Sequence, residues 1–153
     1  MIKLKNSKLT IRFPHITSYQ LYTTLPLCSN MQNVIESLTA SALQGDPLSC
    51  LRLGRLHYVG RGVPEDVGMS LALYYCAELS DDTDVLRELG RMFLKGDFAP
   101  EDPARAAHIY RRAAGLGDRM SSLALGEMYR DGVGVERSAE KARECMRAAG
   151  AEV

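Results

Sequence analysis

Two side chains that could hold a metal ion, Cys50 and His57, stand two helical turns apart in a segment with helical periodicity. A thiolate and an imidazole at this spacing would lie on one face of the helix. A structural zinc site usually takes four ligands, and only two are available here. His57 also occupies a position that is aromatic in two later segments, which favours a packed core histidine. The sequence therefore predicts no metal site.

A second pattern, Ser138-Ala-Glu-Lys141, places a lysine one helical turn after a serine hydroxyl. Serine enzymes that act on penicillins carry this Ser-x-x-Lys spacing together with Ser-Asp-Asn and Lys-Thr-Gly motifs. Neither of these two motifs occurs in this sequence. Ser138 also falls where a helix N-cap is expected. With no other nucleophile and base set in view, the sequence predicts a chain that is not an enzyme and takes no cofactor.

Charge and composition exclude several other classes of function. The 19 basic residues balance 19 acidic ones, so the net charge indicates neither nucleic acid nor an anionic membrane as partner. The basic stretch of Arg105, Arg111 and Arg112 is interpreted as a solvated helix face. The sequence contains no apolar run of about 18 residues, so no membrane span is predicted. The 4 cysteines, at irregular spacing, are expected to be reduced thiols in a cytoplasmic protein, while a periplasmic or secreted location stays open.

The elements that position these residues are predicted by an internal repeat. The pattern Leu-Gly-x-(Leu/Met)-aromatic or His occurs at 53–57, 89–93 and 125–129, with a constant period of 36 residues. A fixed period in this range is typical of stacked helical hairpins. In each copy, a first helix A would bury a stripe at i, i+3 and i+4, and a second helix B would pack against it. The stripes are Leu53, Leu56 and His57; Leu89, Met92 and Phe93; and Leu125, Met128 and Tyr129.

Six glycines recur in register and are assigned structural roles. Gly54, Gly90 and Gly126 lie inside helix A, where glycine costs about 1 kcal/mol relative to alanine, so a neighbouring helix is expected to cross too closely for a Cβ atom. Gly60, Gly96 and Gly132 are expected to end helix A in the left-handed conformation. Aspartate and serine side chains are predicted to cap the helices at Asp46, Asp66, Asp82, Asp102, Asp118 and Ser138.

The same register defines the domain organisation. Residues 1–29 are predicted to be irregular or disordered, and the alternating residues 8–13 would form a short strand without a partner. Residues 30–45 are predicted to be a degenerate half-repeat, a capping helix with Asn30 as its N-cap. Three full repeats follow at 46–81, 82–117 and 118–153.

These recurring residues resemble the Sel-one-like repeat, a tetratricopeptide-like helical hairpin. The resemblance covers residues 46–153 and, weakly, 30–45. It implies an all-α, right-handed α-solenoid of about seven helices with helix A on the concave side. It also implies an adaptor or scaffold that binds a protein or peptide. His57 in the tyrosine position and Phe98 in place of the second turn glycine depart from the pattern and predict locally weaker packing.

A cysteine-rich branch of the same family is associated with β-lactam binding and joins helices through cysteines eight residues apart. The corresponding pairs here are Ala42 and Cys50, Glu78 and Leu86, and Ala114 and Ser122, so no such bridge can form. The β-lactam-binding activity of that branch is therefore not transferred to this chain, and a β-lactam- or peptidoglycan-acting protein is kept only as the alternative function. A toxin-neutralising or effector protein, and a fragment of a longer repeat array, are further alternatives.

Positions between the core residues of helix A form the candidate binding groove. Arginine and tyrosine are enriched among binding hot spots, which favours the basic first half of this groove. The predicted partner-binding residues are Arg52, Arg55, Tyr58, Glu88, Arg91, Lys95, Glu127 and Arg130. Weak self-association is predicted at the C-terminal repeat, where the stacking surface of Met120, Leu123, Ala139, Cys145 and Met146 would remain partly exposed.

Overall fold

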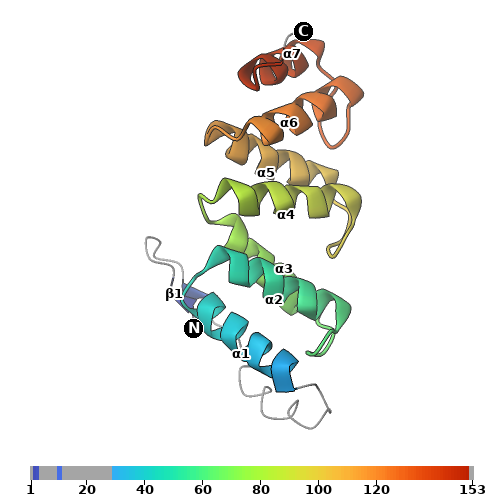
Figure 1. Ribbon diagram of the computed structural model, residues 1–153. Helices are drawn as coiled ribbons and strands as arrows, with labels where there is room; N and C mark the ends of the chain where they lie inside the picture. Colours follow the sequence, from blue (N-terminus) through green and yellow to red (C-terminus); the bar gives the residue numbers. More distant parts are fainter. Residues whose placement is uncertain (1, 4–9, 12–28, 152–153) are drawn as a thin grey trace. The chain divides into compact units, whose positions relative to one another are not determined.

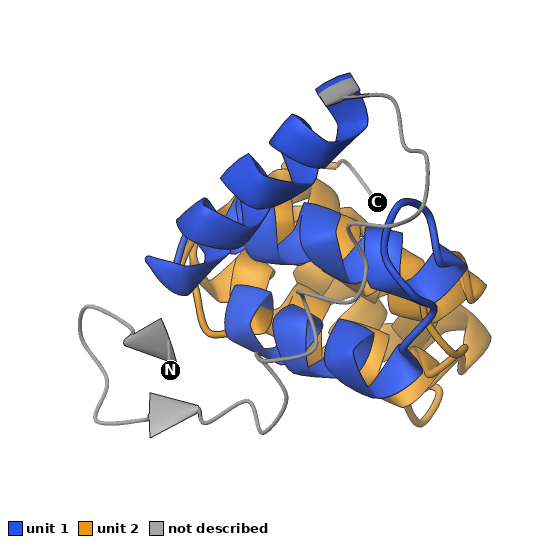
Figure 2. Ribbon diagram, turned by 90° about the horizontal axis from the view of Figure 1, so that it is seen from below, with its two compact units in different colours: residues 1–77 blue, residues 78–153 orange. Residues whose placement is uncertain are grey.

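The computed structural model describes residues 2–3, 10–11 and 29–151, which form seven α-helices and one pair of two-residue strands. The chain divides into two compact units, unit 1 at residues 1–77 and unit 2 at residues 78–153, coloured separately in Figure 2. The helices are labelled in Figure 1: α1 (Ser29–Leu43), α2 (Pro47–Val59), α3 (Val67–Glu78), α4 (Thr83–Lys95), α5 (Pro103–Gly115), α6 (Arg119–Asp131) and α7 (Ala139–Ala148). The described repeat region is all-α, as predicted.

The two strands, β1 (Ile2–Lys3) and β2 (Thr10–Ile11), pair antiparallel, with Ile2 opposite Ile11. The sequence predicts a strand within residues 8–13 but without a partner; the second part of that prediction is wrong, because residues 2–3 supply one. The rest of the segment predicted to be irregular, apart from Ser29, lies outside the described residues. Helix α1 begins at Ser29, so Asn30 lies inside the helix. The prediction that Asn30 is the N-cap of this helix is therefore wrong.

Each hairpin begins at an aspartate. Asp46, Asp82 and Asp118 cap α2, α4 and α6, and each side chain accepts hydrogen bonds from backbone N–H groups in the first helical turn. These N–H groups have no partner within the helix, so the carboxylates satisfy donors that would otherwise be left open. At the other end of each helix, Gly60, Gly96 and Gly132 adopt the left-handed conformation, with φ of 66°, 71° and 76°.

One backbone hydrogen bond closes the turn of all three hairpins in the same way. The N-cap residue of helix B donates to the carbonyl of the core residue at the aromatic position of helix A. The three bonds are Asp66 to His57 at 2.9 Å, Asp102 to Phe93 at 2.8 Å and Ser138 to Tyr129 at 2.8 Å. The hairpins thus share one backbone design although these side chains differ.

The core of each unit lies between its helices. In unit 1, Cys50, Leu51, Leu53, Leu73 and Tyr74 are almost fully buried. In unit 2, α4 and α5 contribute most of the deeply buried side chains, including Leu86, Leu89, Met92, Phe93 and Ile109. Among the residues of α7 only Ala142 is buried, so the last hairpin has a smaller core than the one before it.

Candidate functional site

Close helix packing explains the glycines inside helix A. A Cβ atom added at Gly54 would lie 2.5 Å from the ring of Tyr74, and one at Gly90 would lie 2.8 Å from the ring of Tyr110. Both distances are shorter than side chains tolerate. At Gly126 the nearest atom is Cγ of Met146 at 3.1 Å, so the third hairpin replaces the aromatic contact with a flexible one. Burial raises the pKa of Tyr74 and of Tyr110 to about 12.

The predicted partner-binding residues of unit 1 lie on α2. The side chain of Arg52 is exposed, while Arg55 and Tyr58 are half-buried. Helix α2 carries no acidic residue, and none of the ion pairs found among the described residues includes Arg52. Arg52 and Arg55 are three residues apart, so two positive charges share one helix face.

At the equivalent positions on α4, an arginine is paired with carboxylates. Arg91 donates two hydrogen bonds to the carboxylate of Glu88, at 3.0 Å and 2.9 Å, and its guanidinium also lies 3.6 Å from Asp97. Lys95, the third predicted residue of this helix, is exposed. Glu88 occupies the position that Arg52 holds in the first repeat, and Arg91 the position of Arg55. The sequence predicts that the positive charge of Arg91 binds a partner, but carboxylates within unit 2 already neutralise this charge.

On α6 the predicted residues Glu127 and Arg130 are both exposed. Arg130 donates to the adjacent Asp131 through two hydrogen bonds, at 2.8 Å and 3.0 Å. The predicted arginines therefore differ between the units: Arg52 of α2 has no ion pair among the described residues, whereas Arg91 of α4 and Arg130 of α6 have carboxylate partners.

The residues that could have carried chemistry have structural roles. The Ser138 hydroxyl accepts a hydrogen bond from the backbone N–H of Lys141 at 3.3 Å, which makes Ser138 the N-cap of α7, as predicted. The Lys141 ammonium lies over the ring of Tyr129, 5.4 Å from its centroid, in a cation–π contact. Ser138 thus caps the helix, and Lys141 contacts an aromatic ring of the neighbouring helix.

Cys50 and His57 are both buried, but each has a partner of its own. The Cys50 thiol donates to the carbonyl of Ala42 at 3.8 Å, and a hydrogen bond to Cys76 together with burial raises the pKa of Cys50. His57 Nδ1 lies 3.2 Å from the carbonyl oxygen of Pro64. Burial lowers the pKa of His57, against smaller opposing effects of that hydrogen bond and of Asp66. Within residues 29–151, no cluster of three or more metal-binding side chains occurs.

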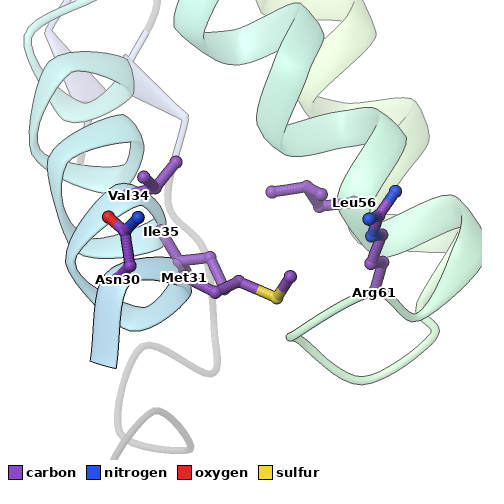
Figure 3. Close-up of a pocket in the computed structure, with 6 residues that line it drawn as sticks. All are labelled: Asn30, Met31, Val34, Ile35, Leu56 and Arg61. Atoms are coloured by element: carbon purple, nitrogen blue, oxygen red, sulfur yellow. The ribbon is translucent and has the colours of Figure 1, made fainter. Parts of the chain in front are cut away.

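An apolar pocket in unit 1 was not predicted from the sequence. Its volume is about 390 Å³, and Figure 3 shows Met31 from α1 and Leu56 from α2 reaching into the space between the two helices. The lining residues are Asn30, Met31, Val34, Ile35, Leu56 and Arg61. Leu56 is predicted to lie in the buried stripe, but it is half-buried here, whereas Met92 and Met128 at the equivalent positions are buried.

The surface predicted for self-association is only partly exposed. Met120 is 60% exposed, whereas Leu123, Cys145 and Met146 are half-buried. Self-association through this surface stays a prediction. No helix among the described residues has the length and apolar character needed to cross a membrane.

Helical hairpins of this length, with glycine in helix A and a left-handed glycine after it, define a helical-repeat protein. The Sel1 repeat model matches residues 47–82, 84–118 and 120–152, which together make up most of the chain. The chain belongs to the Sel1 repeat family. Proteins of this family are commonly protein-interaction scaffolds. No curated protein matches the chain.

Solved structures show the same fold. A protective antigen of uropathogenic Escherichia coli strains, which displays an SLR fold, is similar with 27% identity and a TM-score of 0.62. The match covers 76% of this chain and 25% of the antigen, so the chain spans about a quarter of the length of that protein. A Sel1 repeat protein from Oxalobacter formigenes is similar with 24% identity and a TM-score of 0.59, over 76% of this chain and 87% of that one.

Proposed function

We propose that this protein is a non-catalytic scaffold that binds a protein or peptide partner through the exposed face of α2. The observation that carries the proposal is Arg52, which is exposed and has no ion pair among the described residues, and which lies three residues before Arg55 on a helix without an acidic residue. Two like charges at this spacing repel each other and slightly destabilise an isolated helix. An acidic partner would relieve that repulsion, and charge complementarity would then set both the partner and the association rate.

The faces of α4 and α6 are secondary parts of this proposal. These faces are mixed in charge, and both of their predicted arginines already pair with carboxylates; the residues are Glu88, Arg91, Lys95, Glu127 and Arg130. An exposed ion pair contributes little to binding, because its charges are satisfied before the partner arrives. These residues are therefore expected to affect the choice of partner more than the affinity.

The proposal is tested with a charge reversal on α2. Full-length protein and an Arg52→Glu/Arg55→Glu variant are used to capture partners from native lysate, and the captured protein is then purified and titrated directly. We expect the variant to bind it at least about tenfold more weakly, because each guanidinium that meets a carboxylate in the interface contributes about 1 kcal/mol or more. The affinity should also fall as the salt concentration rises.

A matched control reverses two charges elsewhere. Arg143 and Arg147 are exposed on α7, one helical turn apart, so Arg143→Glu/Arg147→Glu changes the net charge by the same amount. Both variants must show the circular dichroism spectrum of the wild type. Equal binding by wild type and α2 variant would place the partner site elsewhere, and absence of any specific partner would contradict the scaffold function.

The predicted cytoplasmic location belongs to this proposal. It is supported by Cys50, Cys76 and Cys145, which are free thiols in the structure. The rival function as a β-lactam- or peptidoglycan-acting protein has no support of this kind, because Ser138 and Lys141 serve as helix cap and ring contact.

A further inference from the structure

The pocket between α1 and α2 arises from how the two helices meet. Met31, Val34 and Ile35 lie on one face of α1, at i, i+3 and i+4. Ile35 is buried, and its Cδ1 atom would lie 2.7 Å from a Cβ atom added at Gly62, so α1 is held closely against the turn after α2. Val34, one position earlier on the same face, remains 50% exposed.

Leu56 forms the opposite wall of this pocket. At the equivalent positions of unit 2, Met92 and Met128 are 0% and 3% exposed, whereas Leu56 is only half-buried. An apolar wall that residues 29–151 leave partly exposed gains free energy when an apolar group covers it. The volume of about 390 Å³ falls at the lower end of the range for ligand pockets, about 300–1,000 Å³. This suits a side-chain anchor better than a large ligand.

The charge beside the pocket indicates what accompanies that anchor. Arg61 lines the pocket directly, and Arg52 lies one helical turn before Leu56 on the same face of α2. Neither guanidinium has an ion pair or a side-chain hydrogen bond with any residue of the described chain. In unit 2, by contrast, ion pairs engage the guanidinium of Arg91 and that of Arg105. The surroundings of the pocket are therefore complementary to a carboxylate.

We propose that this pocket binds a peptide segment of a partner protein in which a large apolar side chain lies next to aspartate or glutamate. The apolar side chain enters between Met31, Val34 and Leu56, and the carboxylate pairs with Arg61 or Arg52. This inference rests on the proposed scaffold function and adds to it the chemistry of the recognised segment. Helix α1 then acts as one wall of a binding site as well as a cover for the first repeat.

The test uses a displayed library of random peptides, selected on the full-length protein. We expect enriched sequences that combine a leucine, methionine or aromatic residue with a neighbouring acidic residue. One enriched peptide, labelled with fluorescein, is then titrated against variants by fluorescence polarisation. Val34→Asp places a charge in the pocket at an exposed position, and Arg61→Glu reverses the charge at its edge. Each should weaken binding by about tenfold or more, as expected for a contact worth about 1.4 kcal/mol.

Matched controls are available in unit 2. Val133, which is 41% exposed, and the exposed Arg137 lie in and after the turn that follows α6, so Val133→Asp and Arg137→Glu repeat the two chemical changes far from the pocket in sequence. These controls should leave the affinity within about twofold of the wild type, since they remove no contact to the peptide. All variants are first compared by circular dichroism and thermal unfolding.

Several outcomes would overturn the inference. Enriched peptides without acidic residues would remove the role of Arg61 and Arg52. Peptides whose binding is lost in Arg52→Glu/Arg55→Glu but kept in Val34→Asp would retain the scaffold function and reject the pocket. Self-association that Val34→Asp abolishes would make a second copy of the chain the occupant. Saturable binding of decanoate with no enriched peptide would indicate a small amphiphile, and no enrichment at all would reject the peptide site.

Discussion

Five arginines of unit 2 form ion pairs with carboxylates, whereas Arg52 and Arg61 of unit 1 have no ion pair within the described residues. The unit 2 residues are Arg87, Arg91, Arg105, Arg112 and Arg130. Several of these pairs join different elements: Arg105 of α5 reaches Glu78, and Arg87 of α4 reaches Asp118 at the start of α6. The same residue type thus stabilises one unit and remains available on the other. Under the proposed function, the presence or absence of a carboxylate near an arginine decides whether that arginine stabilises the fold or binds a partner.

The largest effect that tests this contrast is expected from Arg105→Ala. Arg105 donates to Glu78 at 2.8 Å and 3.3 Å and lies 4.5 Å from the centroid of the Phe93 ring. The variant would leave the mostly buried Glu78 carboxylate without this partner, so we expect a loss of about 2 kcal/mol in the free energy of unfolding. Arg52→Ala should change it by less than about 0.5 kcal/mol. Urea unfolding followed by circular dichroism measures both, and equal losses would abolish the distinction between the units.

A smaller effect should appear in the pH dependence of stability. Burial lowers the pKa of His57 in the folded protein below its ordinary value of 6.5. As the pH falls through that value, the unfolded chain binds a proton before the folded protein does. Unit 1 should therefore lose stability below about pH 6.5, by at most about 1.4 kcal/mol per pH unit. His57→Phe should remove this loss in thermal unfolding at a series of pH values, and an unchanged pH profile in the variant would contradict the assignment.

The corresponding titration in unit 2 occurs at lower pH. Burial alone would raise the pKa of Asp118, but hydrogen bonds from Ser121 and the charge of Arg87 outweigh it and hold the pKa below the ordinary 3.8. The stability that Asp118 contributes is present above that ordinary value and is lost as the pH falls through the lower, folded pKa. Acidification to about pH 5 should therefore weaken unit 1 through His57 and leave the Asp118 contribution intact.

Exchanging the charges at one position should convert each face into the other. Arg52→Glu would place a carboxylate three residues before Arg55, as Glu88 lies three residues before Arg91. Glu88→Arg would instead place an arginine three residues before Arg91 on α4. We expect the first variant to gain and the second to lose about 0.3–0.5 kcal/mol, because pairs at this spacing contribute that much. Differential scanning calorimetry at low salt would detect the shifts, and both should shrink at high salt. Changes of the same sign in the two variants would refute the exchange.

The smallest effect is expected in the turns. Phe98 has a φ of 63°, a conformation that unit 1 assigns to Gly62 in the equivalent turn. A side chain in this conformation costs about 1 kcal/mol; glycine would remove that cost, but its greater entropy in the unfolded chain offsets part of the gain. Phe98→Gly should therefore raise the free energy of unfolding by about a few tenths of a kcal/mol in urea titrations. A loss of stability would show that the phenyl ring makes a contact that outweighs the strain.

The repeat register makes the hairpins predictable from sequence, because glycine, aspartate and apolar residues at fixed spacing each impose a backbone requirement. The left-handed Gly60 and the cap Asp46 follow directly from residue type. The register does not predict how side chains pair with one another. A comparison of equivalent positions in the three repeats assigns Arg91 to a binding face, although Glu88 already accepts two hydrogen bonds from its guanidinium. Glutamate and arginine three residues apart on a helix are the signal that identifies such a pair.

The pocket was missed for a different reason. Leu56 has the same residue class and register as Met92 and Met128, so periodicity assigns it to the core. Its exposure depends on how α1, a helix outside the regular repeat, lies against α2 and on which α1 residues reach that far. The spacing of residues in the sequence contains no information about how closely α1 packs against α2. The partial exposure of Leu56 is therefore visible only in the three-dimensional structure.

The tyrosines packed over Gly54 and Gly90 also make the protein a spectroscopic reporter of its own hairpins. The chain has 7 tyrosines and no tryptophan, so tyrosine dominates its near-ultraviolet absorbance. Tyr74 and Tyr110, each with a pKa of about 12, should ionise after an ordinary exposed phenol, as a separate alkaline step in the tyrosinate absorbance. Because one belongs to the first hairpin and the other to the second, replacing either with phenylalanine would allow the opening of each hairpin to be followed optically, without an added label.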